Sequence, residues 1–281
     1  MPTDGKVALI DALSHTGLRR IEAVSFVHPK AIPQMADADE VWRRITRVPG
    51  VSYTALVPNS TGAKRARDHG ITEIEVVVSA SDTHNQRNVG RSTSESLADL
   101  AEIAALVDAD GGRCEVVVST AWGCPYEGDI PVDRVLRVAR EAIAAGADRL
   151  TYGDTTGMAT PVRVEALVTE TRAALPEIDL GLHFHNTRGT GLANVLTALR
   201  LGVIDYDASV GGLGGCPYAP GASGNIATEE LVHMLHDCGV RTGVDLDRLL
   251  VVAADAEALV GHELSSQVLR AGPRTRLASA E

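Results

Sequence analysis

Two histidines stand two residues apart at the end of an apolar run, in the segment LGLHFHNT. In an extended strand, alternate side chains point to the same face, so the imidazoles of His183 and His185 are expected to lie side by side. A pair of this kind can bind a metal ion. The alternative is a hydrogen-bonded pair in the core, because histidine is of intermediate burial in proteins.

A glycine- and proline-rich stretch, GGLGGCPYAPGASGNIATEE (211–230), follows a later apolar run. Long loops of this kind tend to carry function. Cys216 lies between a glycine and a proline, where a catalytic thiol could close over a substrate. The amide oxygen of Asn225 suits a hard divalent ion, although capping of the next helix is the alternative role. Two imidazoles and one amide oxygen suit Mg²⁺ or Mn²⁺ and still need a carboxylate.

Acidic side chains end two other apolar runs. Glu22 and Ser25 lie in IEAVSFVHPK, and Glu22 is either a catalytic group or a supporting partner in a salt bridge. Asp154 and Thr155 lie in YGDTTG. They could contact a substrate hydroxyl or a metal-bound water, and the alternative for Asp154 is an N-cap.

A repeated unit must position these side chains. Helical stretches end in Gly17, Gly70, Gly146 and Gly202, and a short β run begins a few residues after each. Glycine adopts the left-handed conformation after a helix at little cost. Helix, glycine and strand in repetition are typical of a parallel β/α protein. The predicted strands are 20–26, 52–57, 73–80, 114–120, 149–153, 180–185 and 204–210, and the predicted helices are 4–16, 37–47, 60–69, 92–109, 131–145, 161–174, 189–201, 225–238 and 246–260.

This pattern predicts an α/β fold of the (β/α)8 TIM-barrel type, in which active sites lie at the C-terminal ends of the strands. Such a barrel needs eight strands to close without an exposed edge. Only seven are predicted and the chain opens on a helix, so the first strand is expected to precede Met1. Residues 1–270 are expected to form one N-terminally truncated barrel domain with extra C-terminal helices, and 271–281 a frayed tail.

The composition narrows the class of function. The chain of 281 residues is 44% hydrophobic but only 3% aromatic, which favours a helix-and-parallel-sheet core of Ala, Val, Leu and Ile. A net charge of -11 without a basic stripe argues against nucleic acid as a partner. No apolar run is long enough to span a membrane, and the N-terminus is not a signal peptide. Four scattered cysteines favour a reducing cytoplasm.

The chain resembles the 3-hydroxy-3-methylglutaryl-CoA lyases of the DRE-TIM metallolyase superfamily over almost its whole length. The likeness is carried by IEAVSFVHPKAIPQMAD, GCPYEG, HFHNT and GGLGGCPYAPGASGNIATEELVHML. It implies a carbon–carbon lyase of leucine catabolism that cleaves 3-hydroxy-3-methylglutaryl-CoA, or a related 3-hydroxyacyl-CoA, to acetyl-CoA and acetoacetate or a related keto acid. It also implies a homodimer that binds an acyl-CoA.

The resemblance assigns roles to the candidate residues. His183, His185 and Asn225 would bind Mg²⁺ or Mn²⁺, and Cys216 would be the loop thiol that protonates the acetyl-CoA enolate. Such an ion acidifies a bound hydroxyl, while a donor stabilises the enolate and an acid protonates it.

The remaining assignments are acids and supporting groups. Glu22 and Asp154 match active-site acids of the family, and Glu229 matches an acid that supports the site from behind. Thr155 and Ser25 are placed in the same supporting layer.

The chain departs from the family at two places. It contains no Arg-Asp-Gly motif, whose Asp binds the metal and whose Arg steadies the enolate in the family. Either the natural protein begins upstream of Met1, or this chain is the product and forms an open barrel with weak metal binding and little activity. The second departure is His-Asn-Thr-Arg in place of the commoner His-Asp-Thr-Tyr, which suggests a different acyl-CoA. The alternatives are therefore another aldolase or acyl-CoA condensing enzyme of the superfamily, or an inactive barrel; a zinc hydrolase would need more ligands.

Overall fold

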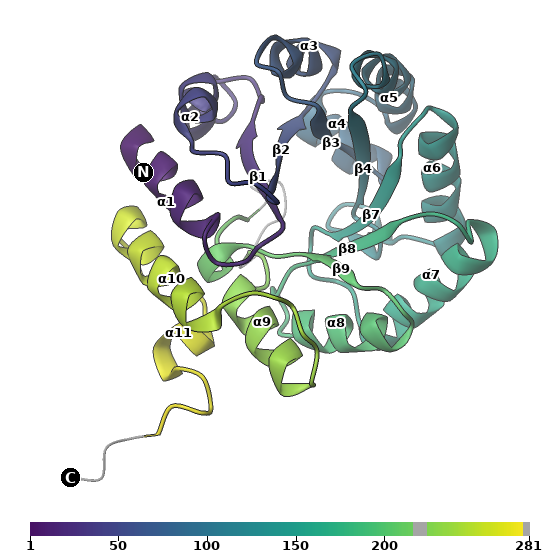
Figure 1. Ribbon diagram of the computed structural model, residues 1–281. Coiled ribbons are helices and arrows are strands. Elements are labelled where there is room, and N and C mark those ends of the chain that lie inside the picture. Colours follow the sequence, from purple (N-terminus) through teal and green to yellow (C-terminus); the bar gives the residue numbers. More distant parts are fainter. Residues whose placement is uncertain (216–223, 278–281) are drawn as a thin grey trace.

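A curled sheet of seven parallel strands forms the centre of the structure, a computed structural model that describes residues 1–215 and 224–277 (Figure 1). The strand order is β1-β2-β3-β4-β7-β8-β9, so each strand pairs with its neighbour in the chain. A short antiparallel hairpin of β5 and β6 is inserted after β4. The strands are β1 (Arg20–Ser25), β2 (Ser52–Val57), β3 (Glu73–Ser79), β4 (Arg113–Ser119), β5 (Gly123–Cys124), β6 (Gly128–Asp129), β7 (Arg149–Asp154), β8 (Leu180–Phe184) and β9 (Asp205–Asp207).

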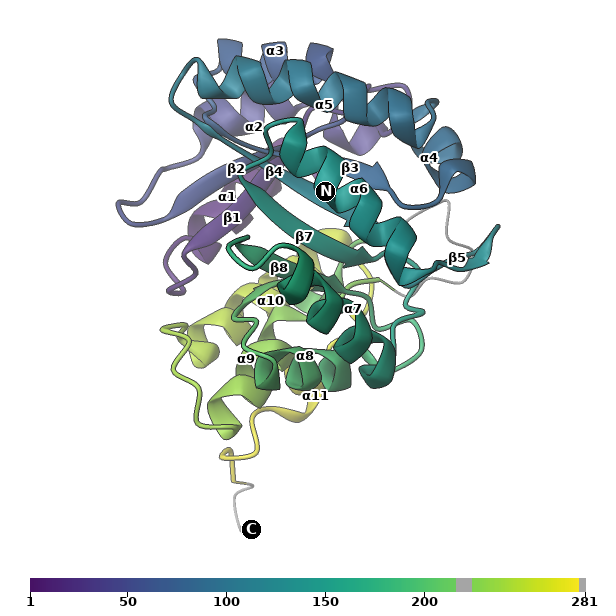
Figure 2. The ribbon, with the colours of Figure 1, turned by 90° about the vertical axis from the view of Figure 1, so that its right-hand side faces the viewer.

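Helices surround the outer side of the sheet, as Figures 1 and 2 show from two directions. The C-terminal α10 packs beside α1 and α9, which brings the two ends of the described chain to the same side of the molecule. The helices are α1 (Thr3–Leu13), α2 (Ala38–Arg44), α3 (Ser60–Asp68), α4 (Asp82–Val89), α5 (Thr93–Asp108), α6 (Val132–Ala144), α7 (Pro161–Ala174), α8 (Gly191–Arg200), α9 (Thr228–Asp237), α10 (Leu246–Val260) and α11 (Gln267–Ala271), with 3-10 turns η1 (Pro33–Met35) and η2 (Val210–Gly212).

Local sequence signals account for the boundaries of these elements. The four glycines predicted to follow helices all have positive φ angles: 91° at Gly17, 69° at Gly70, 102° at Gly146 and 81° at Gly202. At Gly17 a side chain is also excluded, because a Cβ would lie 2.2 Å from the carbonyl oxygen of Gly243. The repeated helix–glycine–strand unit is therefore confirmed.

The strands separate an apolar outer face from a polar inner one. On β7 and β8 the alternate residues Leu150, Tyr152, Leu182 and Phe184 are fully buried against the helices. The intervening positions face the inside of the curl, where the Thr151 hydroxyl contacts a carboxylate of β4. The hydrophobic core thus lies between the sheet and the helices, and polar side chains are free to gather inside.

The prediction of seven parallel strands with extra C-terminal helices is confirmed, and the predicted range of α7 and α10 matches the structure. Three elements were not predicted: α4, α11 and the β5–β6 hairpin. The helix predicted from residue 225 begins only at Thr228, because Asn225 pairs with His185 in an isolated antiparallel bridge. Among the described residues, no helix is long and apolar enough to cross a membrane.

Candidate active site

His183 and His185 lie on the inner face at the C-terminal end of β8. Their ring centroids are 5.2 Å apart, as the strand period predicts. His185 is only 5% exposed, whereas His183 is partly open to the inside of the curl. Burial lowers the pKa of His183 to about 4, against smaller opposing contributions from Asn225 and Glu115. Burial, followed by the neighbouring His183, lowers the pKa of His185 to about 3. Both rings are therefore neutral at pH 7, with a nitrogen lone pair available to a metal.

Backbone hydrogen bonds bring Asn225 to this pair from far along the chain. The N–H of Asn186 donates to Gly224 O over 3.0 Å, and the N–H of Ile226 donates to Phe184 O over 3.1 Å. The amide nitrogen of Asn225 then donates to Leu213 O over 2.7 Å, which fixes the orientation of its side chain. Asn225 is thus held in a strand-like stretch against β8 rather than on a helix.

Among the residues that the structure describes, two polar atoms of this group are buried without a hydrogen-bond partner. They are Nδ1 of His185 and Oδ1 of Asn225. A buried acceptor without a partner costs free energy, so it commonly has a ligand, an ion or water beside it. Neutral imidazoles and an amide oxygen are donors that a divalent cation accepts. The residues present therefore fit a divalent metal ion.

Carboxylates gather inside the curl next to the histidines. Oxygens of Glu75, Glu115 and Asp207 all lie within 4.8 Å of one another, which makes them a second group of described residues able to hold a metal. Asp207 Oδ2 lies 3.9 Å from Nδ1 of His183. Arg20 forms ion pairs with Glu75 and Glu115, at 3.9 Å for Glu75.

Glu22 joins this carboxylate cluster from the edge strand β1. The Glu22 side chain is exposed to solvent. It lies on the concave side of the sheet, where the other carboxylates of the cluster are its neighbours. Burial raises its pKa to about 7, a hydrogen bond with Glu75 opposes the rise, and the charge on Asp207 adds to it. Burial also raises the pKa of Asp207 to about 6, helped by Glu115. Glu22 can therefore gain or lose a proton near neutral pH.

Asp154 lies at the end of β7, where its carboxyl group is 1% exposed. One oxygen accepts the N–H groups of Met158 and Ala159 at 2.8 and 3.0 Å, while Oδ2 has no partner in the described part of the chain. It stabilises the turn before α7 and is not the N-cap, which is Thr160. Burial raises the pKa of Asp154 to about 7, although the two backbone hydrogen bonds oppose the rise. Its catalytic role stays a prediction.

Of the predicted supporting residues, Glu229 contacts a loop beside the site. Both carboxylate oxygens of Glu229, which is fully buried, lie 3.1 Å from the N–H of Gly211. Gly211 has a φ of 66°, so Glu229 secures a left-handed turn at the start of the glycine-rich loop. The hydroxyl of Ser25, also predicted to support the site, is buried and has no hydrogen-bond partner in residues 1–215 and 224–277. Cys216 lies outside the described residues, and its role stays a prediction.

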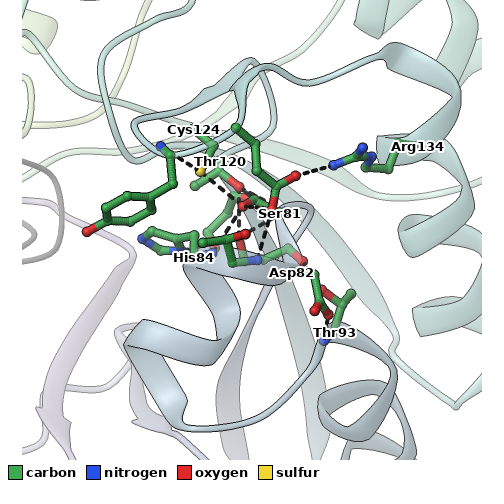
Figure 3. Close-up of polar contacts among 12 residues, drawn as sticks. Ser81, Asp82, His84, Thr93, Thr120, Cys124 and Arg134 are labelled. Atoms are coloured by element: carbon green, nitrogen blue, oxygen red, sulfur yellow. Dashed lines mark hydrogen bonds and ion pairs between the residues drawn. The ribbon is translucent and has the colours of Figure 1, made fainter.

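A polar network follows the ends of β3 and β4 beside the site (Figure 3). Thr155 Oγ1 accepts the N–H of Thr120 over 3.2 Å. Within the described ranges, Thr120 is the only non-glycine residue with a positive φ, of 55°. The Thr120 hydroxyl contacts the Ser79 hydroxyl at 2.7 Å. Ser81 donates to Glu127 over 2.7 Å and also contacts the buried thiol of Cys124 at 3.0 Å. The network therefore fixes the loop of the GCPYEG motif onto the rim of the barrel.

We expect the variant Glu127→Gln to unfold at lower urea concentration, because the Glu127 carboxylate accepts from Ser81, the N–H of Thr83 and Arg134. Losing charge-assisted bonds of this kind costs about 1–3 kcal/mol. Although burial opposes it, these bonds lower the pKa of Glu127 to about 2. The stabilisation is thus fully present above the ordinary value of 4.5 and is lost progressively as pH falls from there to about 2. Urea denaturation should therefore show a smaller deficit in the unfolding free energy of Glu127→Gln at pH 3 than at pH 7. The exposed Asp129→Asn is the control. An equal deficit at both pH values would contradict the stabilising role of the Glu127 carboxylate.

Apart from Glu22, the inner carboxylates and arginines were not predicted from the sequence. Their signal was a charged residue at alternate positions of a strand, as in RIE, EIE, RCE and DYD. This period of two places both charges on one face, and a charged face inside an apolar strand run indicates a polar barrel interior. Thr120 carried no such signal, because threonine rarely adopts positive φ.

The chain is similar to known proteins over most of its length. The family model HMGL-like matches residues 1–255. The hydroxymethylglutaryl-CoA lyase of Bacillus subtilis is 46% identical, over 95% of this chain and 90% of that protein. The (R)-citramalyl-CoA lyase of Chloroflexus aurantiacus is 40% identical, over 95% of this chain and 88% of that protein.

Solved structures agree in fold. An HMG-CoA lyase from Acinetobacter baumannii, in complex with coenzyme A and 3-methylmalate, superposes with a TM-score of 0.95 at 44% identity, covering 100% of this chain and 92% of that one. The Bacillus subtilis HMG-CoA lyase gives a TM-score of 0.93 at 45% identity, covering 96% and 91%. The predicted TIM-barrel class is therefore confirmed.

Proposed function

Because the chain belongs to the HMGL-like family, we propose that it is a divalent-metal-dependent carbon–carbon lyase that cleaves 3-hydroxy-3-methylglutaryl-CoA to acetyl-CoA and acetoacetate. The observation that carries the proposal is the buried, neutral His183–His185 pair with the unpartnered amide oxygen of Asn225 beside it. This set lies at the end of β8, on the side of the barrel where catalytic groups gather.

The metal proposed is Mg²⁺ or Mn²⁺, held by His183, His185 and Asn225. A bound divalent ion polarises the hydroxyl and carboxylate oxygens of a substrate and lowers the pKa of the hydroxyl. The two histidines can serve as ligands at neutral pH because burial holds their pKa values at about 4 and about 3. The carboxylates of Glu115 and Asp207 supply negative charge close by.

The chain's own acids handle protons. Glu22 lies among the inner carboxylates, and its pKa of about 7 lets it accept the proton of the substrate hydroxyl and release it again. Asp154 has a similar pKa and keeps one oxygen unpartnered, which makes it the second candidate acid or base. The enolate left by cleavage of the carbon–carbon bond would be protonated by the thiol of Cys216.

A second candidate substrate is a citramalyl-CoA, since the Chloroflexus aurantiacus relative that is 40% identical acts on the (R) isomer. The Arg of His-Asn-Thr-Arg, Arg188, gives no support to this second substrate. Arg188 donates to the carbonyl oxygens of Thr156 and Gly157 over 2.7 and 3.1 Å, so its guanidinium secures the loop after β7.

The purified protein should release acetyl-CoA from 3-hydroxy-3-methylglutaryl-CoA in the presence of Mg²⁺ or Mn²⁺, and chelation by EDTA should abolish the release. A coupled assay for acetyl-CoA, run in parallel with (R)-citramalyl-CoA, measures both candidates. A higher kcat/KM with citramalyl-CoA would replace the proposed substrate. Failure of this chain alone would favour the inactive-barrel alternative. Failure with both thioesters from a folded, metal-loaded protein extended upstream to include an Arg-Asp-Gly strand would refute the lyase assignment.

Two further proposals rest on the same family membership. A cytoplasmic location follows from the scattered cysteines and from the cytoplasmic mouse relative, which is 40% identical over 99% of this chain. A homodimer is proposed by resemblance, and sedimentation velocity of the purified protein tests it.

A further inference from the structure

We propose that Asp207 is a positioning residue for His183: its carboxylate holds the ring proton on Nδ1, so that Nε2 is the nitrogen offered to the metal. The inference rests on the proposed metal-dependent function. It adds to that function a residue from β9, a strand from which the sequence suggested no functional group.

The pairing of the strands places the two side chains together. His183 on β8 is the register partner of Asp207 on β9, and paired residues of neighbouring strands project to the same face. Nδ1 of His183 lies 3.9 Å from Oδ2 of Asp207. The position of Asp207 is therefore set by the backbone and not by a mobile loop.

The electrostatics favour one tautomer. A separation of 3.9 Å is longer than a direct hydrogen bond, so the carboxylate acts on the ring through its charge. In a partly desolvated interior, a negative charge at this distance attracts the positive end of an N–H bond and repels a nitrogen lone pair. The proton of the neutral ring is thereby favoured on Nδ1, and the lone pair on Nε2.

A carboxylate behind a metal-binding histidine is a common means of fixing both ring orientation and basicity. Removing such a partner typically lowers metal affinity about 10–100-fold. Asp205 provides a matched control on the same strand and face, because it pairs with Arg149 and not with a histidine. Glu115→Gln separates two explanations, because Glu115 belongs to the carboxylate cluster but is not the register partner of His183.

The test has one readout that needs no metal. Long-range ¹H–¹⁵N NMR spectra of the metal-free protein should show His183 protonated on Nδ1, and Asp207→Asn should shift the ring toward the Nε2-protonated tautomer or a mixture. Asp205→Asn should leave the His183 signals unchanged. An unaltered tautomer in Asp207→Asn would overturn the proposal.

The second readout is metal affinity. Electron paramagnetic resonance titration with Mn²⁺ should give a Kd about 10–100-fold higher for Asp207→Asn, with Asp205→Asn close to the wild type and Glu115→Gln affected less than Asp207→Asn. A wild-type Kd in Asp207→Asn would also overturn the proposal. If Glu115→Gln weakens binding as much as Asp207→Asn, the ion is held by the carboxylates and Asp207 is a direct ligand instead. If the wild-type protein binds no Mn²⁺, the proposed metal dependence is refuted. The NMR measurement of the His183 tautomer still tests the effect of Asp207, because it needs no metal.

Discussion

His185→Ala should abolish measurable Mn²⁺ binding and lower the rate of acetyl-CoA release on the order of 10³-fold or more. The side chain is 5% exposed, and its Nδ1 has no hydrogen-bond partner among the described residues, which leaves this nitrogen for a ligand. Metal polarisation of a substrate oxygen is worth several kcal/mol of the barrier, and each 1.4 kcal/mol is about tenfold in rate. Mn²⁺ titration and an acetyl-CoA assay measure the two effects.

The same experiment decides between the two groups of metal-binding residues. One consists of His183, His185 and Asn225, and the other of the carboxylates of Glu75, Glu115 and Asp207. His262→Ala is the matched control, because this exposed histidine contacts only the carbonyl oxygen of the next residue among its described hydrogen bonds. Wild-type Mn²⁺ affinity in His185→Ala would move the ion to the carboxylates and contradict the proposed site.

The order of the strands and the positions of the histidines could be predicted because both follow from local rules. Glycine tolerates the positive φ that ends each helix, as at Gly146, and a strand period of two puts His183 and His185 on one face. These signals span a few residues each. They suffice to give the sequence of elements and the end of the barrel at which the histidines lie.

Contacts between distant segments could not be predicted in the same way. Asn225 looked like the start of a helix, but hydrogen bonds from Asn186 and Ile226 draw its segment alongside β8. The proximity of Asp207 to His183 depends on the register of two strands, which no local pattern fixes. The raised pKa values of Glu22 and Asp154 likewise depend on burial by residues far away in the chain.

Asp154→Asn should separate stability from activity. Burial raises the pKa of Asp154 from the ordinary value of 3.8 to about 7, so the folded protein binds a proton there more tightly than the unfolded chain. Between these two values, the folded state holds more protons, and the free energy of unfolding falls as pH rises. The loss by pH 8 is at most about 4 kcal/mol, at roughly 1.4 kcal/mol for each pH unit. An amide does not ionise, so the variant should escape this loss.

The prediction is therefore a difference that changes with pH. At pH 4 the wild-type carboxyl is already neutral, and the variant should be equal or lower in stability, since a new buried N–H group without a partner costs about 1–3 kcal/mol. At pH 8 the variant should be the more stable protein, because its amide oxygen can still accept the N–H groups of Met158 and Ala159. Urea denaturation from pH 4 to 8 measures the pH at which the variant becomes more stable than the wild type. Asp148→Asn is the control, since Asp148 also accepts a backbone N–H.

Activity tests the catalytic role of the same residue. Acetyl-CoA release by Asp154→Asn should fall at least about 10²-fold if Asp154 moves a proton. Full activity in Asp154→Asn would show that Asp154 acts only to stabilise the turn before α7. A difference in unfolding free energy that stays constant with pH would show that burial does not raise the pKa of Asp154.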